Sequence, residues 1–424
     1  MAHKSIDIPT GSGASPSGLS PSGLSPSGLS PSGRSVTELV ARSGGLKGEL
    51  VHFAQSSRFE RQLTARLLEA ADRHGGALDE DMAVLIIDHF ALQQRLSDGR
   101  TVVERFVAQR RPPLSEDDKA MVLGWRNVVE GSFEVQQPDG DALVVHNLVD
   151  DLVYQLYSNM GRGAFAELQP GMFVVGRIVP VHPALDAWLV SGHLAAYPRS
   201  AGPQLAQAVA EAVATVPEVA FRNPENLERA WELQAEDRAD FIAYFGCDLV
   251  ILPPDEAERG LREYWRRRQE KLLEGLEGKA AEGARSLALA PEQLFQLPDD
   301  LRSADTVAIV YDETEGLSFY GDYGHLDALF ADPSLARDRD HAARLRAYLR
   351  DDSVSPSAIR RLVARHPAEV NRVFRAVLGK SQFSWERDGE ALLRRRKKEF
   401  FEREPRPSFA PVGDRVAELL RAGR

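Results

Sequence analysis

The stretch GSFEVQQPDGDALVVHNLVDDLVYQLYS, Gly131–Ser158, decides the fold class of this chain. It alternates β-branched and aromatic residues with turn dipeptides at Asp139-Gly140 and Asp150-Asp151. A second stretch, LQPGMFVVGRIVPVHPALDAWLVSGHLAAYP, Leu168–Pro198, continues this pattern with two more strands. Because about five short strands fall within about seventy residues, we predict a small β-barrel of the OB or SH3-like kind over residues 127–200.

Helical patterns flank this barrel on both sides. Apolar residues recur at three- and four-residue spacing from Val36 onward, which predicts a helical domain over residues 36–126. A helical region is predicted over residues 201–285. The C-terminal region, residues 286–424, combines two strands within Thr306–Gly324 with further helices. The predicted fold class is therefore α+β, with a short sheet in a helical C-terminal half.

Residues 1–35 have a different composition from the rest of the chain. The tripeptide PSG recurs at Pro16, Pro21, Pro26 and Pro31, which gives the repeat SPSGL. Proline at this spacing blocks a helix, and serine and glycine bury too little apolar area to offset the entropy lost on ordering. We expect a disordered tail that acts as a spacer or tether.

The bulk composition limits the class of protein. With 424 residues, 43% of them apolar and 27% charged, the chain is typical of a soluble globular protein with several domains. The single cysteine, Cys247, excludes an internal disulfide and a zinc site built on several thiolates. No run of about eighteen apolar residues occurs, and the N-terminus has no signal-peptide core. We expect a cytoplasmic protein without a membrane partner.

The charge is unevenly distributed along the chain. The net charge of −11 argues against non-specific DNA packaging, because a uniformly acidic surface repels phosphate. Residues 355–398, however, contain twelve basic and four acidic residues, a local net of +8 that leaves −19 for the remainder. This asymmetry predicts a basic face in the C-terminal helices that contacts nucleic acid or another polyanion.

The most basic part of this region is FSWERDGEALLRRRKKEFFEREPRP, Phe383–Pro407, in which five consecutive basic residues precede two phenylalanines. The upstream stretch SAIRRLVARHPAEVNRVFRAVLGK, which a proline at 367 divides, adds further arginines. Arginine suits phosphate because its guanidinium forms bidentate hydrogen bonds. Alternatively, these side chains pair with acidic residues elsewhere in the chain. The candidate nucleic-acid-binding residues are Arg360, Arg361, Arg365, Arg394, Arg395 and Lys398.

A second candidate site is the acidic turn YDETEGLSFYGDYGH, Tyr311–His325, which follows a predicted strand. Carboxylate and imidazole ligands suit a hard divalent ion such as magnesium or manganese. The candidate metal ligands are Asp312, Glu313, Asp322 and His325. The alternative is a solvated hairpin turn followed by a helix.

Other chemistry-bearing residues match no known template. The barrel histidines His146, His182 and His193 have no zinc-ligand spacing, and we expect them to have structural roles. Cys247 has no basic neighbour in sequence that would lower its pKa, so we expect an inert thiol. The sequence contains no GxSxG, Walker A or GxGxxG motif, and we expect no cofactor.

The run LSDGRTVVERFV … GWRNVVEGSFEV … LQPGMFVVGRIVPV … WLVSGH resembles, over roughly residues 88–198, a family of uncharacterised bacterial proteins. Many of these end in a SEC-C zinc motif, a short cysteine-rich knuckle. The resemblance implies a barrel between helices and no known activity. Because the knuckle needs three cysteines and a further histidine or cysteine, and Cys247 stands alone, the zinc is not carried over.

These observations lead to three functional hypotheses. The leading one is a non-catalytic binding or adaptor protein with an unknown protein partner, whose basic C-terminal face contacts nucleic acid or another polyanion. The second is a divalent-metal-dependent hydrolase that uses the acidic turn at 312–325. The third is a structural or assembly protein that is tethered by its N-terminal tail.

Overall fold

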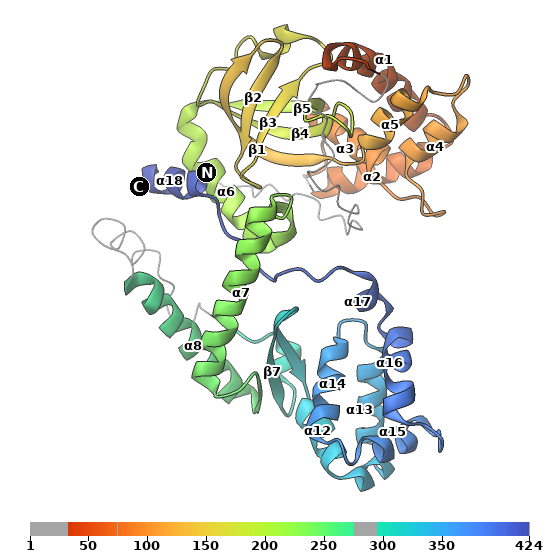
Figure 1. Cartoon of the computed structure of the whole chain (residues 1–424), viewed down its shortest axis with the longest axis vertical. Coiled ribbons are helices and arrows are strands. Elements are labelled where there is room, and N and C mark those ends of the chain that lie inside the picture. The colour runs from red at the N-terminus through yellow and green to blue at the C-terminus, as the bar shows by residue number, and fades with distance from the viewer. Residues whose placement is uncertain (1–32, 74, 275–294, 424) are drawn as a thin grey trace. The chain divides into compact units, whose positions relative to one another are not determined.

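The structure, a computed structural model, describes residues 33–73, 75–274 and 295–423 (Figure 1). The predicted disordered tail therefore lies outside the described residues, except for its last three. The boundary predicted between residues 285 and 286 lies outside them as well. In the part that is described, no helix is long and apolar enough to cross a membrane.

The described residues form two compact units. Unit 1 contains the residues up to Glu211 together with Val412–Gly423, and unit 2 contains Ala212–Pro411. The helical domain predicted over 36–126 and the barrel predicted over 127–200 are therefore parts of one unit. The last helix of the chain also belongs to unit 1, although sequence analysis assigned it to the C-terminal region.

Unit 1 begins with a group of helices. Their bounds are α1 (Val36–Ala54), α2 (Glu60–Arg73), α3 (Glu80–Leu92), α4 (Val102–Gln109) and α5 (Glu116–Gly124). Four of these begin at side-chain caps, because Ser35, Asp79, Thr101 and Ser115 each accept a hydrogen bond from the backbone amide three residues later. At α1 and α4 the side chain of a glutamate three residues after the cap also accepts a hydrogen bond from the backbone amide of the cap residue, which completes a capping box.

The predicted barrel follows these helices. Its strands are β1 (Val129–Asp139), β2 (Ala142–Asn147), β3 (Val153–Tyr157), β4 (Phe173–Pro180) and β5 (Trp188–Tyr197), with the short helices η2 (Arg162–Phe165) after β3 and η3 (Arg199–Ala201) after β5. They pair in the ring β1-β2-β3-β5-β4, and β4 returns to β1. Only the β3–β5 pairing is parallel, and it comprises just two residue pairs. The ring therefore closes through this one short parallel contact.

Both predicted turn dipeptides stand at strand ends. Gly140 has φ +59 and joins β1 to β2, while Asp151 has φ +59 and lies between β2 and β3. Left-handed backbone of this kind suits glycine and, among other residues, aspartate or asparagine. On β1, Gly131 leaves room for the buried Asn147, because a Cβ at residue 131 would lie 2.2 Å from its Oδ1 atom.

One hydrophobic core joins the barrel to the helices. Val179 and Leu189, on β4 and β5, pack in the same cluster as Leu46, Phe90 and Trp125 from the helical part. The outer wall of the barrel at β4 and β5 is therefore covered by helices. The inner faces of the strands form a separate barrel core.

The chain then crosses from unit 1 to unit 2 through α6 (Gly202–Thr215) and η4 (Pro217–Ala220). Unit 2 contains a sheet made of β6 (Leu249–Leu252), β7 (Val307–Asp312) and β8 (Gly316–Gly321). Its helices are α7 (Pro224–Phe245), α8 (Pro254–Glu274), α11 (Asp299–Arg302), α12 (Tyr323–Ala331), η5 (Pro333–Arg337), α13 (Arg339–Arg350), α14 (Pro356–Arg365), α15 (Val370–Leu378), α16 (Trp385–Arg396) and α17 (Lys398–Glu402). The chain ends with α18 (Asp414–Ala422) in unit 1.

The sheet of unit 2 lies between two helical layers, with α7 and α8 on one side and α12–α16 on the other (Figure 1). Strand β7 is central in the antiparallel order β6-β7-β8. Its residues alternate between the two cores: Ala308 and Val310 face one, whereas Ile309 and Tyr311 face the other. Because β7 is buried on both faces, its sequence is a continuous apolar run, Val307–Tyr311, rather than an alternation of apolar and polar residues.

Candidate functional site

Two arginines predicted to contact nucleic acid pair with carboxylates of unit 2. Arg360 of α14 donates two hydrogen bonds to Glu390 of α16, with N–O distances of 2.8 and 2.9 Å. Arg365, at the end of α14, lies 3.2 Å from a carboxylate oxygen of Asp327. These pairs hold α14 against neighbouring helices. A phosphate would have to compete with a protein carboxylate for each guanidinium.

Arg361 joins residues from both predicted sites. Its guanidinium donates to Asp248 at 2.8 Å and to Asp312 at 3.2 Å. Burial alone would raise the pKa of Asp312, but hydrogen bonds from Thr314 and the charge of Arg361 hold that pKa below its ordinary value. Asp312 is thus an ionised partner of Arg361 and anchors α14 to the ends of β6 and β7.

The end of α16 has a different environment. Arg394, Arg395 and Arg396 are exposed there, and we call these three residues the arginine cluster. The guanidinium of Arg394 lies 4.6 Å from the ring centre of Phe401. Neither Arg395 nor Arg396 has a carboxylate partner within the described ranges. The cluster is therefore the part of the predicted basic face that remains available to an external anion.

Lys397, in the middle of the basic run, is buried. It lies between α16, which ends at Arg396, and α17, which begins at Lys398. Its side chain is 1% exposed, and its ammonium donates to the carbonyl oxygens of Tyr348, at 2.6 Å, and Asp351. Burial lowers its pKa. Lys397 thus satisfies carbonyls at the end of α13, while the exposed Lys398 pairs with Glu402 at 3.3 Å.

The four predicted metal ligands do not come together. Asp312 and Glu313 lie at the turn between β7 and β8, whereas Asp322 and His325 lie at the start of α12. The latter two approach Asp305, and one potential ligand atom from each of the three residues lies within 4.8 Å of the others. Sequence analysis missed Asp305 because it precedes β7 and becomes a neighbour only when the hairpin pairs.

At least one potential metal-ligand atom of each residue in this trio already takes part in a hydrogen bond or ion pair within the protein. His325 Nε2 lies 2.8 Å from Asp305 Oδ2, and Asp322 Oδ1 accepts from the backbone amide of Asp305 at 2.9 Å. The other oxygen of Asp322 pairs with Arg344 of α13. The trio therefore fastens the segment before β7 to the start of α12, and a divalent ion would have to displace Arg344.

The barrel histidines are also kept apart. His146 bonds to Asp151 at 2.7 Å, and His193 lies 3.3 Å from Asp81. His182 is buried, and burial lowers its pKa. The three imidazoles thus have separate surroundings, as expected for structural roles.

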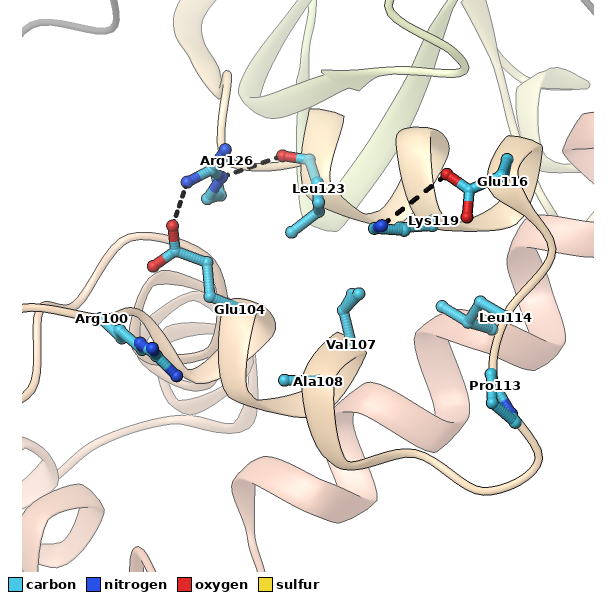
Figure 2. Close-up of a pocket in the computed structure, with 10 residues that line it drawn as sticks. All are labelled: Arg100, Glu104, Val107, Ala108, Pro113, Leu114, Glu116, Lys119, Leu123 and Arg126. Carbon is cyan, nitrogen blue, oxygen red and sulfur yellow. Dashed lines mark hydrogen bonds and ion pairs between the residues drawn. The ribbon is translucent and has the colours of Figure 1, made fainter.

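Sequence analysis also missed a pocket of about 480 Å³ between α4 and α5 (Figure 2). Its lining combines the apolar or mostly apolar residues Val107, Ala108, Pro113, Leu114 and Leu123 with the charged residues Arg100, Glu104, Glu116, Lys119 and Arg126. Arg126 pairs with Glu104, and Lys119 lies 3.7 Å from Glu116, so most of the charge at the rim is neutralised. The lining of this pocket contains no serine, cysteine or histidine.

The barrel has the opposite charge to the arginine cluster. Residues 127–198 contain eight acidic and two basic residues. Neither basic residue lies on β1, β2 or β3. Barrels of the OB kind that bind single-stranded nucleic acid do so with a positively charged groove, which these strands lack.

Comparisons with known proteins give no further guide. No family model, curated protein or solved structure matches the chain. The resemblance of residues 88–198 to bacterial proteins that end in a SEC-C motif therefore stays a prediction.

Proposed function

We propose that this chain is a non-catalytic binding or adaptor protein whose unit 2 contacts the phosphates of a nucleic acid through the arginine cluster. The observation that carries this proposal is the exposure of three successive arginines, two of which have no carboxylate partner in the described part of the chain. Arginine binds phosphate through charge-assisted, often bidentate hydrogen bonds.

The surroundings of the cluster support this proposal. The guanidinium of Arg403 lies 4.2 Å from the ring centre of Phe400, and that of Arg394 lies over Phe401. The rings hold these guanidiniums in place, and a planar guanidinium offers both charge for a phosphate and a flat surface on which a base can stack. Cations at the end of α16 also interact favourably with the helix dipole, so the folded protein holds them without a carboxylate.

We expect the triple substitution Arg394→Gln/Arg395→Gln/Arg396→Gln to weaken binding of single-stranded RNA at least about tenfold at low salt, because it removes three phosphate contacts. Fluorescence anisotropy of labelled RNA, titrated with the full chain at several salt concentrations, measures this loss. Each lost contact also reduces the slope of log affinity against log salt by roughly 0.7. A parallel titration with duplex DNA tests which form of nucleic acid is preferred.

The matched control is Arg372→Gln/Arg387→Gln. Both arginines are exposed in unit 2, and each pairs with a carboxylate, Glu369 or Asp388. This control is expected to change affinity by less than twofold per removed charge. If the full chain fails to bind RNA or DNA at low salt, or if the control loses as much affinity per charge as the cluster variant, the proposal is wrong.

A divalent-metal site is the second candidate, and the approach of Asp305, Asp322 and His325 favours it. Because Arg344 pairs with Asp322, the guanidinium competes with any ion at this position. We expect Arg344→Gln to raise the affinity for Mn²⁺, measured by equilibrium dialysis, and the added substitution His325→Ala to abolish that gain. Equal Mn²⁺ binding by all three proteins would remove this candidate.

A further inference from the structure

One strip of the barrel surface combines exposed apolar groups with acidic groups. It consists of the outward-facing residues Gln137, Asp139, Val144, Val153, Gln155 and Tyr157, which we call the barrel strip. The strand registers place Gln137, Val144 and Gln155 in one row across β1, β2 and β3. Inward residues of the same strands fill the barrel core, so the strip is the opposite, outer side of a well-packed sheet.

The apolar part of the strip is unusually accessible. Val153 is 59% exposed, and Val144, its diagonal neighbour on β2, is partly exposed. Large apolar side chains at neighbouring positions on a sheet surface are typical of a surface that another protein covers. Their exposure gives a partner apolar area to bury.

The charged part of the strip is acidic. Asp139 and Asp141 flank the β1–β2 turn, and both are exposed. Neither has an ion-pair partner among the residues that the structure describes. Tyr157 on β3 packs partly against the helical core; this burial raises its pKa, and the charges of Asp139 and Asp141 raise it further.

The same outer wall of the barrel already binds an amphipathic helix of this chain through one of its arginines. Arg415 of α18 forms a bidentate pair with Glu134 of β1, with N–O distances of 2.7 and 2.6 Å. Val416 and Leu419 bury the apolar side of α18 in unit 1. The register places Glu134 opposite His146, and His146 opposite Val153. The binding surface for α18 is therefore continuous with the barrel strip.

We propose that the barrel strip docks a basic amphipathic segment of a partner protein. The partner's cations lie near Asp139 and Asp141, and its apolar residues cover Val144 and Val153. This inference goes beyond the contact proposed for unit 2, because it concerns the other unit and a ligand of opposite charge. The absence of lysine and arginine from β1, β2 and β3 disfavours a nucleic acid on the same strip.

The test uses the full chain and a fluorescein-labelled peptide that keeps the apolar face of α18 and carries arginine at all of its remaining positions. We expect this peptide to bind at low salt, as measured by anisotropy. Asp139→Lys/Asp141→Lys is expected to weaken binding at least about tenfold, because it reverses two charges at the strip. Val153→Ser should weaken binding without changing its salt dependence.

The charge-matched control is Glu167→Lys/Asp186→Lys, since both acids are exposed and lie outside β1, β2 and β3, the strands that form the strip. It is expected to bind the peptide within about twofold of the unchanged protein. Circular dichroism of each variant verifies that the fold is kept. Three results would each overturn the proposal: no binding of the arginine peptide, an equal loss in the control, or equal binding of a peptide with glutamate in place of arginine. Single-stranded RNA that binds and is released by Val153→Ser would overturn it as well.

Discussion

Asp88→Ala is expected to lower the free energy of unfolding of unit 1 by about 3–5 kcal/mol, because it leaves two buried cations without their shared partner. Asp88 of α3 accepts from Lys47 of α1 at 3.1 Å and from Arg177 of β4 at 3.0 Å. Ser191 of β5 donates to the same carboxylate at 2.7 Å. This one carboxylate therefore connects two helices to two barrel strands.

The electrostatics of Asp88 give this prediction a pH dependence. Burial alone would raise its pKa, but the charges of Lys47 and Arg177 and the Ser191 hydrogen bond hold the pKa below its ordinary value. A lowered pKa in the folded state adds stability that is present above the unfolded-state pKa and is lost as the pH falls through the folded-state pKa. Asp88→Ala should remove this part of the acid sensitivity of unit 1.

Hydrogen exchange of the full chain, followed by mass spectrometry, measures the effect for each unit separately. Exchange of core amides in α3 and β5 is expected to become roughly a hundredfold faster or more in Asp88→Ala, while unit 2 stays unchanged. The control is Asp81→Ala on the same helix, because Asp81 is 63% exposed in its pair with His193. A surface pair of this kind contributes about 0–1 kcal/mol. Similar exchange in both variants would contradict the role assigned to Asp88.

Asp237→Ala is expected to destabilise unit 2 by a similar amount, about 3–5 kcal/mol. The buried carboxylate of Asp237 accepts from the hydroxyl groups of Tyr264 and Tyr311, each at 2.6 Å, and pairs with Arg268. Burial and the Asp237 carboxylate both raise the pKa values of the two tyrosines, so their hydroxyls stay protonated donors. Removing Asp237 leaves the buried hydroxyl of Tyr311 without an acceptor, and it takes from Tyr264 and Arg268 their nearest acceptor, between α7, α8 and β7.

Glu236→Ala is the matched control for this substitution. Glu236 is the neighbour of Asp237 on α7 and is exposed, with Arg229 at 3.5 Å. We expect its replacement to change stability by less than about 1 kcal/mol. Amide exchange in β7, which is central in the sheet, distinguishes the two variants. If β7 amides exchange at the same rate in Asp237→Ala as in the unchanged protein, the network around Asp237 does not stabilise unit 2.

Local sequence patterns predicted the barrel well and its connections poorly. Alternating residues and the dipeptides at 139–140 and 150–151 carry the barrel signal, because strand period and turn chemistry act between near neighbours. The return of α18 to the barrel depends on Arg415 meeting Glu134 across 281 residues of sequence. No local pattern encodes such a pairing. For the same reason, sequence analysis placed a domain boundary between residues 126 and 127. The structure instead has one hydrophobic core there, which joins the helices to the barrel.

For the predicted basic face, too, the sequence showed the local feature but not the long-range contacts. Its charge was visible in the sequence, and Arg394, Arg395 and Lys398, three of its predicted residues, are exposed. The partners of Arg361, by contrast, come from Asp248 and Asp312, which only the folded sheet brings close. Lys397 looked like its neighbours in sequence, yet its ammonium is buried at the end of α13. Whether a basic residue is exposed or paired is thus decided by tertiary packing.

The most direct test of phosphate binding by the arginine cluster is to map where RNA touches the full chain. Single-stranded RNA that carries 4-thiouridine would be photo-crosslinked to the protein, and the crosslinked peptides identified by mass spectrometry. We expect crosslinks in residues 385–406, at Phe400 and Phe401 beside the arginines. Crosslinks confined to the barrel strands β1–β3, or no crosslink at low salt, would contradict the proposed function.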